Sequence, residues 1–389
     1  MKLLAFTSLY PNNVWPNHGV FIKERLTKLA EHQPFQIKII APVPYFPPIK
    51  VSPRWRFSQV RRFEQRDGLD VYHPRYFMVP KVSMILHGFL VFLATYRLVR
   101  KLSKTYRFDL IDAHYVYPDA LAAVLIGILL RKPVVVSVRG SDINVLREFP
   151  IIRRMLKFTF RKSQHVITVS EALASLVVQM GIPRSKVSVI SNGIDVKKFF
   201  PVPRNECKKK LGLPQGQLLL SVGRLTENKG FHLLVRALSE IRKGDNHYNL
   251  HLAIIGHGTF REELVTEIKA SGMEDYVRLV GEVAHDDLVD WYNAADIFCL
   301  ASATEGWPNV VMESLACGTP VVATAVGGIP EILGDSRYGL LSERNAEVLA
   351  TQIICALEKS WDRDELIHFA RTRTWESVAT RLSQLYHAL

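Results

Sequence analysis

Two carboxylates stand eight positions apart, at Glu305 and Glu313, around the expected start of a helix. Pro308 suits the first turn of a helix, where its missing N–H is no loss, and Gly318 suits a helix end. Residues 310–317 are therefore predicted to be helical. Because ionised carboxylates accept hydrogen bonds from hydroxyl groups, the pair could hold the two ends of one polyhydroxylated ligand.

The spacing of these carboxylates suits a nucleotide sugar. At about 1.5 Å per residue, eight helical residues span roughly 12 Å, about the distance from the ribose to the sugar ring in an extended molecule. Backbone N–H groups at residues 306–310 would face the diphosphate, and the helix dipole would favour its charge. We therefore expect the nucleotide sugar to be bound by Gly306, Trp307, Asn309 and Val310 together with Glu313.

Further patterns occur between residues 192 and 331. They are Gly223-Arg224-Leu225 with Lys229-Gly230, Asn192-Gly193-Ile194-Asp195, and Gly327-Gly328-Ile329-Pro330-Glu331. Together with the Glu-x7-Glu pair, their order and spacing resemble the retaining GT-B glycosyltransferases of family 4 (glycosyl transferases group 1), in particular bacterial members of polysaccharide biosynthesis. The resemblance implies an α/β fold of two doubly wound, Rossmann-like domains that face an interdomain cleft, hexose transfer from a nucleotide-diphosphate sugar, and no metal or other cofactor.

The family pattern gives a role to each charged residue. Arg224 and Lys229 are expected to clamp the diphosphate as a guanidinium fork and a point charge. Glu313 is expected to accept hydrogen bonds from the ribose diol. Glu305 would face the sugar and stabilise positive charge at the anomeric carbon. A nucleophilic Glu305 is disfavoured, because carboxylates eight apart on one loop and helix cannot easily flank a glycosidic bond from opposite sides.

Other candidates follow the ends of expected strands, where open parallel sheets bind ligands. In the second domain they are Gly223, Gly256, Gly258, Gly281 and Glu282. Gly256 and Gly258 would bring backbone N–H groups near the ligand. In the resembled family, the loop at residues 281–283 lies against the nucleotide base.

The first domain contributes candidates of its own. Gly19 resembles the glycine of a family loop that approaches the diphosphate, although many members have two adjacent glycines where this chain has His18-Gly19. His114 matches the family's histidine near the sugar hydroxyls. Arg139, where the family commonly has His, is expected on the acceptor side. Asp142 could orient the acceptor hydroxyl, or it could cap the next helix.

Short apolar runs alternate with longer amphipathic stretches, which indicates parallel sheets with crossover helices. The runs are residues 3–7, 37–41, 110–113, 134–138, 165–169 and 187–190, then 218–222, 251–255, 277–280, 297–300 and 320–324. A proline-containing segment at 199–204 separates the two series, so we expect domains at 1–200 and 201–374. Residues 375–389 have helical apolar spacing, and in the resembled family such a helix packs back on the first domain.

The basic charge lies in one half of the chain. Residues 1–200 hold 31 Lys and Arg against 12 Asp and Glu, whereas residues 201–389 hold 19 against 25. Nucleic acid is disfavoured as the partner because no helix-turn-helix, zinc-finger or RNP pattern is present. A diphosphate substrate and an anionic membrane surface fit the charge. The four cysteines form no Cys-x-x-Cys pair, which fits a reducing cytosol and no zinc site.

A membrane-facing surface is expected in the first domain. Aromatic and basic side chains alternate in residues 42–66, at Arg54, Trp55, Arg56, Arg61 and Arg62. Such residues suit a lipid headgroup interface, and a folded substrate loop is the alternative. The apolar stretch 84–96 is too short to span a bilayer, which takes about 20 residues. It is predicted to be a helix that is buried or lies on the membrane.

These patterns lead to one expected function. The chain is expected to be a cytoplasmic, retaining, metal-independent glycosyltransferase at the inner face of a membrane, with a UDP- or GDP-sugar donor and a lipid-linked saccharide acceptor. A GT-B nucleotide-sugar epimerase is the alternative enzyme, and it would alter the donor without any acceptor. A catalytically degenerate nucleotide-sugar sensor is the alternative without activity, although Arg224, Lys229, Glu305 and Glu313 are all present.

Overall fold

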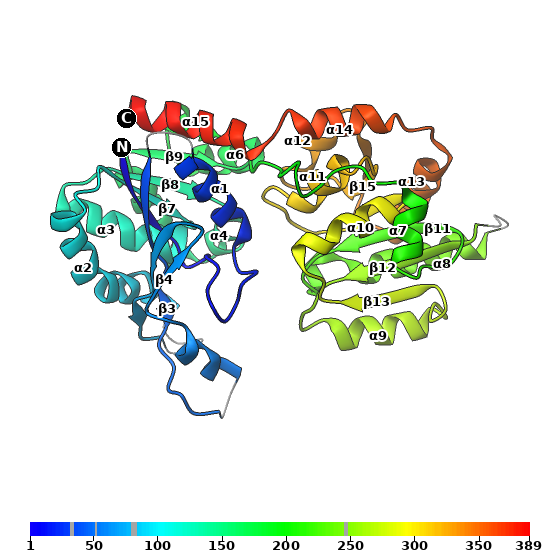
Figure 1. Ribbon diagram of the computed structural model, residues 1–389, viewed down its shortest axis with the longest axis horizontal. Helices are drawn as coiled ribbons and strands as arrows, with labels where there is room; N and C mark the ends of the chain where they lie inside the picture. Colours follow the sequence, from blue (N-terminus) through cyan, green and yellow to red (C-terminus); the bar gives the residue numbers. More distant parts are fainter. Residues whose placement is uncertain (32–34, 51–52, 79–83, 245–247) are drawn as a thin grey trace. The chain divides into compact units, whose positions relative to one another are not determined.

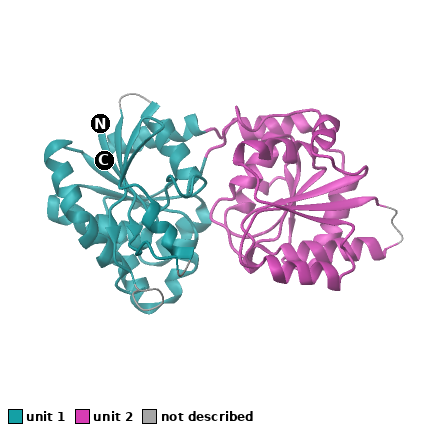
Figure 2. Ribbon diagram, turned by 60° about the horizontal axis from the view of Figure 1, so that its bottom comes forward, with its two compact units in different colours: residues 1–192, 375–389 teal, residues 193–374 magenta. Residues whose placement is uncertain are grey.

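The computed structural model describes residues 1–31, 35–50, 53–78, 84–244 and 248–389. They form two compact units, coloured separately in Figure 2: residues 1–192 with 375–389, and residues 193–374. Each unit is built around a mainly parallel sheet that is covered by helices (Figure 1). In the expected membrane-facing segment 42–66, residues 51–52 lie outside the described residues.

The first unit contains a sheet with the strand order β10-β9-β8-β7-β1-β2-β5-β4. Its strands are β1 (Lys2–Phe6), β2 (Gln36–Ile40), β4 (Phe63–Arg66), β5 (Leu69–Tyr72), β7 (Leu110–His114), β8 (Val134–Val138), β9 (His165–Thr168) and β10 (Val187–Val189), and a separate small sheet pairs β3 (Val43–Pro44) with β6 (Arg75–Tyr76). Neighbouring strands run parallel except β4 and β5, which form an antiparallel pair. All five residues of β8 are buried, as expected for a strand covered on both faces.

Helices surround this sheet. They are α1 (Val20–Glu31), α2 (His87–Thr105), α3 (Leu121–Leu130), α4 (Ser141–Asn144), α5 (Pro150–Lys162), α6 (Glu171–Gln179) and α15 (Trp375–Ala388), with a 3-10 turn η1 (Pro53–Gln59) and a π-helical turn η2 (Val116–Ala120). The C-terminal helix α15 lies beside α1, and both pack their apolar side chains into one core with β1 and β2 (Figure 1). The helix at the chain's end is thus part of the unit formed by its beginning.

The second unit has the strand order β13-β12-β11-β14-β15-β16. The strands are β11 (Gln217–Val222), β12 (Leu250–Ile255), β13 (Val277–Gly281), β14 (Ile297–Leu300), β15 (Val321–Thr324) and β16 (Gly339–Ser342), and the helices are α7 (Arg204–Lys210), α8 (Phe231–Lys243), α9 (Arg261–Ala270), α10 (Leu288–Ala294), α11 (Asn309–Ala316), α12 (Ile329–Leu333), α13 (Ala346–Glu358) and α14 (Arg363–Arg371), with 3-10 turns η5 (Glu227–Lys229) and η6 (His285–Asp287). Separate apolar cores occupy the two faces of the sheet. Asn345 and Asp362 cap α13 and α14 by accepting backbone N–H bonds, which fixes where these helices begin.

Two expectations about the chain's organisation need correction. The division falls at residues 192 and 193, not at 200 and 201. Ile194 pairs with Thr374 as a β-bridge, and the Phe199 side chain is buried in the core of the second unit, so 199–204 is not a free linker.

The apolar segment 84–96 contributes to the longer helix α2. In the part of the chain that the structure describes, no helix is both long enough and apolar enough to cross a bilayer.

Candidate active site

A lysine–carboxylate pair lies at the carboxyl edge of the second sheet. The Nζ of Lys229 is 2.5 Å from Oε1 of Glu305, and the hydroxyl of Ser302 donates to the same oxygen at 2.7 Å. Lys229 ends the η5 turn after β11, and Glu305 lies in the loop between β14 and α11. The fold therefore brings together the expected phosphate cation and the expected sugar-facing carboxylate, at adjacent strand ends.

Arg224 lies in the turn after β11, and its side chain is exposed. Two strand-end loops stack to form this turn: Leu225 N–H donates to His257 O at 2.9 Å, and a Cβ placed on Gly256 would lie 1.8 Å from Gly223 O. Gly256 also has a φ of +144°, so a side chain is excluded on both grounds. These expected donor-binding glycines thus pack backbone against backbone and hold Arg224 at the edge of the sheet.

The Gly258 position belongs to the same stack, since a Cβ there would lie 2.1 Å from Leu225 O. Gly281 is the last residue of β13, and its backbone oxygen accepts from Gly256 N–H at 2.8 Å. Next to it, the Glu282 carboxylate lies 3.3 Å from Nδ1 of His257. The candidates expected near the nucleotide therefore gather at the ends of neighbouring strands β12 and β13.

Helix α11 begins at Asn309, one residue before its expected start, with Pro308 as its N-cap. Gly306, Trp307 and Val310 are all partly exposed around this helix N-terminus. The indole Nε1 of Trp307 is buried without a hydrogen-bond partner among the described residues. An unpaired indole N–H beside the positive end of a helix can donate to an anionic or hydroxyl group of a ligand.

The Glu313 side chain is held deeper in the unit, with only 5% of the residue exposed. Tyr292 donates its hydroxyl to Oε2 at 2.8 Å, and Nε2 of His285 lies 3.1 Å from Oε1. Burial lowers the pKa of His285, but the hydrogen bond and charge of Glu313 outweigh burial, so its pKa is raised. The carboxylate is thus fixed in orientation and keeps spare lone pairs that could accept ligand hydroxyls.

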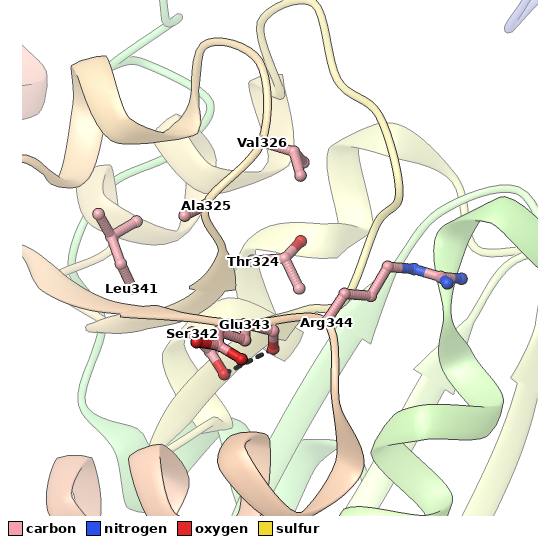
Figure 3. Close-up of a pocket in the computed structure, with 7 residues that line it drawn as sticks. All are labelled: Thr324, Ala325, Val326, Leu341, Ser342, Glu343 and Arg344. Atoms are coloured by element: carbon pink, nitrogen blue, oxygen red, sulfur yellow. Dashed lines mark hydrogen bonds between the residues drawn. The ribbon is translucent and has the colours of Figure 1, made fainter.

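A cavity of about 420 Å³ opens at the carboxyl ends of β15 and β16. Figure 3 shows the residues that line it: Thr324, Ala325, Val326, Leu341, Ser342, Glu343 and Arg344. The Thr324 hydroxyl donates to Ser302 O at 2.7 Å, and a Cβ on nearby Gly327 would lie 1.9 Å from Glu305 O. The cavity wall thus supports the loop that carries Glu305, which gives the expected Gly327-Gly328 motif a packing role.

In the first unit, His114 is completely buried at the end of β7. Its Nδ1 lies 2.7 Å from Nη2 of Arg139, and its Nε2 lies 3.2 Å from Oδ2 of Asp112. Arg139 Nη1 donates to Asn192 Oδ1 at 3.0 Å, and the guanidinium lies 5.5 Å from the centre of the Phe21 ring. The structure therefore places His114 behind Arg139, with both ring nitrogens facing protein atoms rather than open space.

Asp142 does not cap the next helix, which was one of its two expected roles. Its carboxylate is fully buried and accepts backbone N–H bonds from Gly140 at 2.7 Å, Arg139 at 3.1 Å and Val116 at 2.9 Å. It lies inside the short helix α4 rather than before it, so it is not the N-cap. The carboxylate thus joins the loops after β7 and β8.

Gly19 lies in the turn just before α1, against the backbone of Leu9.

The basic residues of the expected membrane surface lie on and after η1, where Arg54, Arg56, Arg61 and Arg62 are exposed and Trp55 is half-buried. These groups are described within the first unit, which also carries most of the basic charge.

Several contacts could not be anticipated from local sequence patterns. Tyr292 and His285 reach Glu313 from elements 21 and 28 residues away, and Ser302 reaches Glu305 across a loop. Asp112 lies two residues before His114, and this close spacing on one strand was the available signal. Arg25 and Tyr386, which lie near this pair, carry no motif at all.

The chain is similar to known proteins over most of its length. The family described as Glycosyl transferases group 1 matches residues 203–373, and Glycosyltransferase Family 4 matches residues 61–198. The chain is 28% identical over 370 residues to the putative teichuronic acid biosynthesis glycosyltransferase TuaC of Bacillus subtilis (strain 168). This match covers 91% of this chain and 88% of TuaC. The chain is 30% identical over 273 residues to the putative colanic acid biosynthesis glycosyltransferase WcaL of Escherichia coli (strain K12), covering 67% of this chain and 64% of that one.

The fold is also found in solved structures. Anabaena Alr3699/HepE, in complex with UDP, superimposes with a TM-score of 0.77 at 20% identity and covers all of both chains. Two family models thus match consecutive parts of the chain, and the fold of the whole chain is that of a solved GT-B structure. The chain therefore belongs to the family 4 glycosyltransferases and has the GT-B fold.

Proposed function

We propose that this glycosyltransferase moves a hexose from a UDP- or GDP-linked donor to a lipid-linked saccharide, with retention of anomeric configuration and without a metal ion. The pathway is the biosynthesis of a cell-surface polysaccharide at the inner face of the membrane. The relatives TuaC and WcaL are named as putative glycosyltransferases of teichuronic and colanic acid biosynthesis, and HepE was solved with UDP. These likenesses support the polymer class and the nucleotide donor.

The observation that carries the proposal is the grouping of Arg224, Lys229 and Glu305 at the carboxyl edge of one sheet. Breaking the bond between the anomeric carbon and the diphosphate leaves negative charge on phosphate oxygen. Two cations and the N-terminus of α11 can stabilise that charge, as a preorganised site does. Glu305 holds the Lys229 ammonium in place before the donor arrives.

The sugar then transfers to the acceptor in a single front-side step. The acceptor oxygen forms a bond to the anomeric carbon as the bond to the diphosphate breaks, and the acceptor proton passes to the leaving phosphate oxygen. Glu305 stabilises the positive charge that develops on the sugar, and no covalent bond to it forms. Glu313, oriented by Tyr292 and His285, accepts the ribose hydroxyls.

The first unit supports a lipid-borne acceptor. Apolar side chains are exposed at the start of α2. Leu86, just before the helix, is 56% exposed, and Phe89 and Leu93 within it are 40% and 66% exposed. The exposed cations Arg97, Arg100, Lys101 and Lys104 follow on the same helix. Exposed apolar side chains beside cations suit the surface of an anionic membrane, where each Lys or Arg contributes about 1 kcal/mol.

The test is a transfer assay with the purified protein, a nucleotide-sugar panel and a lipid extract. We expect activity in EDTA to remain within about twofold of the untreated enzyme, because Arg224 and Lys229 replace a metal at the diphosphate. NMR of the product should show the anomeric configuration of the donor. An inverted product, or a requirement for added divalent ions, would contradict the proposal. Conversion of the donor without any acceptor would favour an epimerase.

A further inference from the structure

A cluster of charged and polar side chains is buried beneath Arg139 in the first unit. Arg25 on α1 is 1% exposed, Asp112 and His114 on β7 are fully buried, and Tyr386 on α15 is 2% exposed. Charged side chains are almost never fully buried unless they are paired, so this cluster calls for a specific arrangement. It joins the first helix, a central strand and the C-terminal helix.

The contact between His114 and Arg139 fixes where the imidazole proton lies. A guanidinium has only N–H donors, so Nδ1 of His114, 2.7 Å from Nη2 of Arg139, must be the acceptor. The proton of the neutral ring is then on Nε2, which lies 3.2 Å from Oδ2 of Asp112. Carboxylate, imidazole and guanidinium therefore lie next to one another. The contact of Asp112 with His114 is an electrostatic one, since neither Nε2 nor the Asp112 oxygens have an aligned hydrogen-bond partner among the described residues.

Arg25 and Tyr386 act on the Asp112 carboxylate. Nη2 of Arg25 donates to Ser137 Oγ at 3.1 Å and lies 3.5 Å from the Tyr386 hydroxyl. Burial would raise the pKa of Asp112, but His114, Arg25 and Tyr386 outweigh it and hold the pKa below the usual range. Burial lowers the pKa of His114 to about 4, against the charge of Asp112, so the ring is neutral at neutral pH.

The Arg139 guanidinium has N–H groups beyond those that its two neighbours use. Nη1 and Nη2 each donate one N–H, to Asn192 and His114, and each carries a second, whereas Nε is buried and has no partner among the described residues. The residue lies at the carboxyl end of β8, the edge where open parallel sheets bind ligands, and it is partly exposed there. His114 is fully buried behind it.

We propose that Arg25, Asp112 and Tyr386 are positioning residues, which keep His114 in the Nε2–H form so that its Nδ1 holds the Arg139 guanidinium ready for a phosphate oxygen of the substrates. The inference rests on the proposed glycosyl transfer. It assigns ligand contact at this edge to Arg139 rather than to His114. It also makes the C-terminal helix part of the machinery that orients a substrate-binding side chain.

The sharpest test is Asp112→Asn. The cationic Arg25 and the Tyr386 hydroxyl favour the amide oxygen on their side, so the amide NH₂ faces Nε2 of His114. The ring must then accept at Nε2 and carry its proton on Nδ1, where it opposes the N–H donors of Arg139. We expect turnover to fall about 10- to 100-fold, the range observed when a partner that orients a metal-binding side chain is removed. Asp109→Asn, at an exposed carboxylate just before β7, is the matched control and should stay within twofold of wild type.

A spectroscopic measurement separates this inference from the proposed function. Long-range ¹H–¹⁵N NMR of histidine-labelled protein, with the His114 signals assigned through His114→Gln, should show an Nε2–H ring in the wild type and an Nδ1–H ring in Asp112→Asn. If no donor is turned over by any form, the glycosyl-transfer proposal fails, yet the spectra still decide the tautomer. An Nδ1–H ring in the wild type, or a tautomer change with unaltered turnover, would overturn the positioning role.

Two further variants keep the proposal testable should Asp112→Asn not fold. Tyr386→Phe keeps the ring packed beside Phe35 and removes the hydroxyl, and it should lower turnover several-fold while Tyr106→Phe does not. Arg25→Met removes a charge that lowers the pKa of His114, so the acid limb of the turnover profile should move to higher pH. The charged groups that face this ring are Asp112, Arg25 and Arg139. Turnover and pH profile unchanged in both variants would contradict the proposal.

Discussion

The Lys229 ammonium lies 2.5 Å from the Glu305 carboxylate, although 76 residues separate them in the chain. The side chains of both residues are mostly shielded, 26% and 11% exposed respectively. The cation expected to meet the diphosphate is therefore already oriented by the carboxylate expected to meet the sugar. A ligand that bridges the two would find both groups in place, which reduces the cost of ordering them on binding.

Removal of either cation should slow transfer without loss of the fold. Arg224→Ala and Lys229→Ala should each lower turnover by about 100-fold or more, the scale of one preorganised electrostatic group. Lys243→Ala is the matched control, since Lys243 forms an exposed ion pair with Glu240 on α8 of the same unit. Circular dichroism should be unchanged in all three variants. Near-wild-type kinetics for Arg224→Ala and Lys229→Ala would remove these residues from the site.

Glu313→Gln should act mainly on donor binding. The carboxylate accepts from Tyr292 and His285, and an amide replaces one of its acceptor oxygens with a donor. We expect the donor Kd to rise about 10-fold or more, since hydrogen bonds to charged groups contribute about 1.5–3 kcal/mol each. Isothermal titration with the nucleotide measures this. The prediction fails if donor affinity is unchanged and only turnover falls.

Reversal of the basic charges on the first unit should weaken membrane binding. Arg54, Arg56, Arg61 and Arg62 changed together to Glu should reduce sedimentation with anionic vesicles and activity on a lipid-linked acceptor, yet spare slow donor hydrolysis. An equal reversal on the second unit, at exposed Lys209, Lys243, Arg261 and Lys269, is the control. Absence of vesicle binding by the wild type at low salt would point to a soluble acceptor.

Asp119 should make the first unit less stable as pH rises. The carboxyl group is fully buried, and burial raises its pKa to about 7, although two hydrogen bonds from Ser8 oppose the shift. The unfolded carboxyl group loses its proton near pH 4, so between about pH 4 and 7 the folded form holds a proton that the unfolded form has released. Stability is then lost as pH rises through this window.

Asp119→Asn removes this titration, so urea denaturation should show the variant gaining stability relative to wild type from pH 5 to pH 8. The free energy of unfolding of the variant minus that of the wild type should increase by on the order of 2–4 kcal/mol over this range, at about 1.4 kcal/mol per pH unit. Asp109→Asn, at an exposed carboxylate, should give no comparable change. A difference between wild type and Asp119→Asn that stays constant with pH would contradict the prediction.

The core strands could be predicted from sequence because they are covered on both faces. Their continuous apolar runs placed β8 at 134–138 and β14 at 297–300 with the observed bounds, and the other predicted strands lie within one residue of the observed ends. The hairpin of β4 and β5 was missed, since both strands are only four residues long and β4, at the sheet edge, is largely polar. Asp67-Gly68, with φ of 49° and 76°, is the turn that could have revealed it.

The candidate site could be predicted only in part. Glu305, Glu313, Arg224 and Lys229 lie in local patterns, but their partners do not. Tyr292 reaches Glu313 because α10 and α11 pack together, and Arg25 meets Tyr386 because α1 packs on α15. Such contacts depend on the topology of the fold and on how the helices pack, which no short stretch of sequence reveals. For the same reason, the sequence did not reveal that His114 is buried behind Arg139.

Donor binding by the unit of residues 193–374 is the central claim, and a thermal-shift panel of UDP, GDP, ADP and their sugars tests it most directly. The nucleoside diphosphate of one base, and the nucleotide sugar that carries the same base, should each stabilise the wild type by about 2.7 kcal/mol at a ligand concentration of 100 Kd. The stabilisation should be lost in the Arg224→Ala/Lys229→Ala double variant. If no nucleotide stabilises the wild type, or if the double variant is stabilised equally, the donor site is not where Arg224, Lys229 and Glu305 place it.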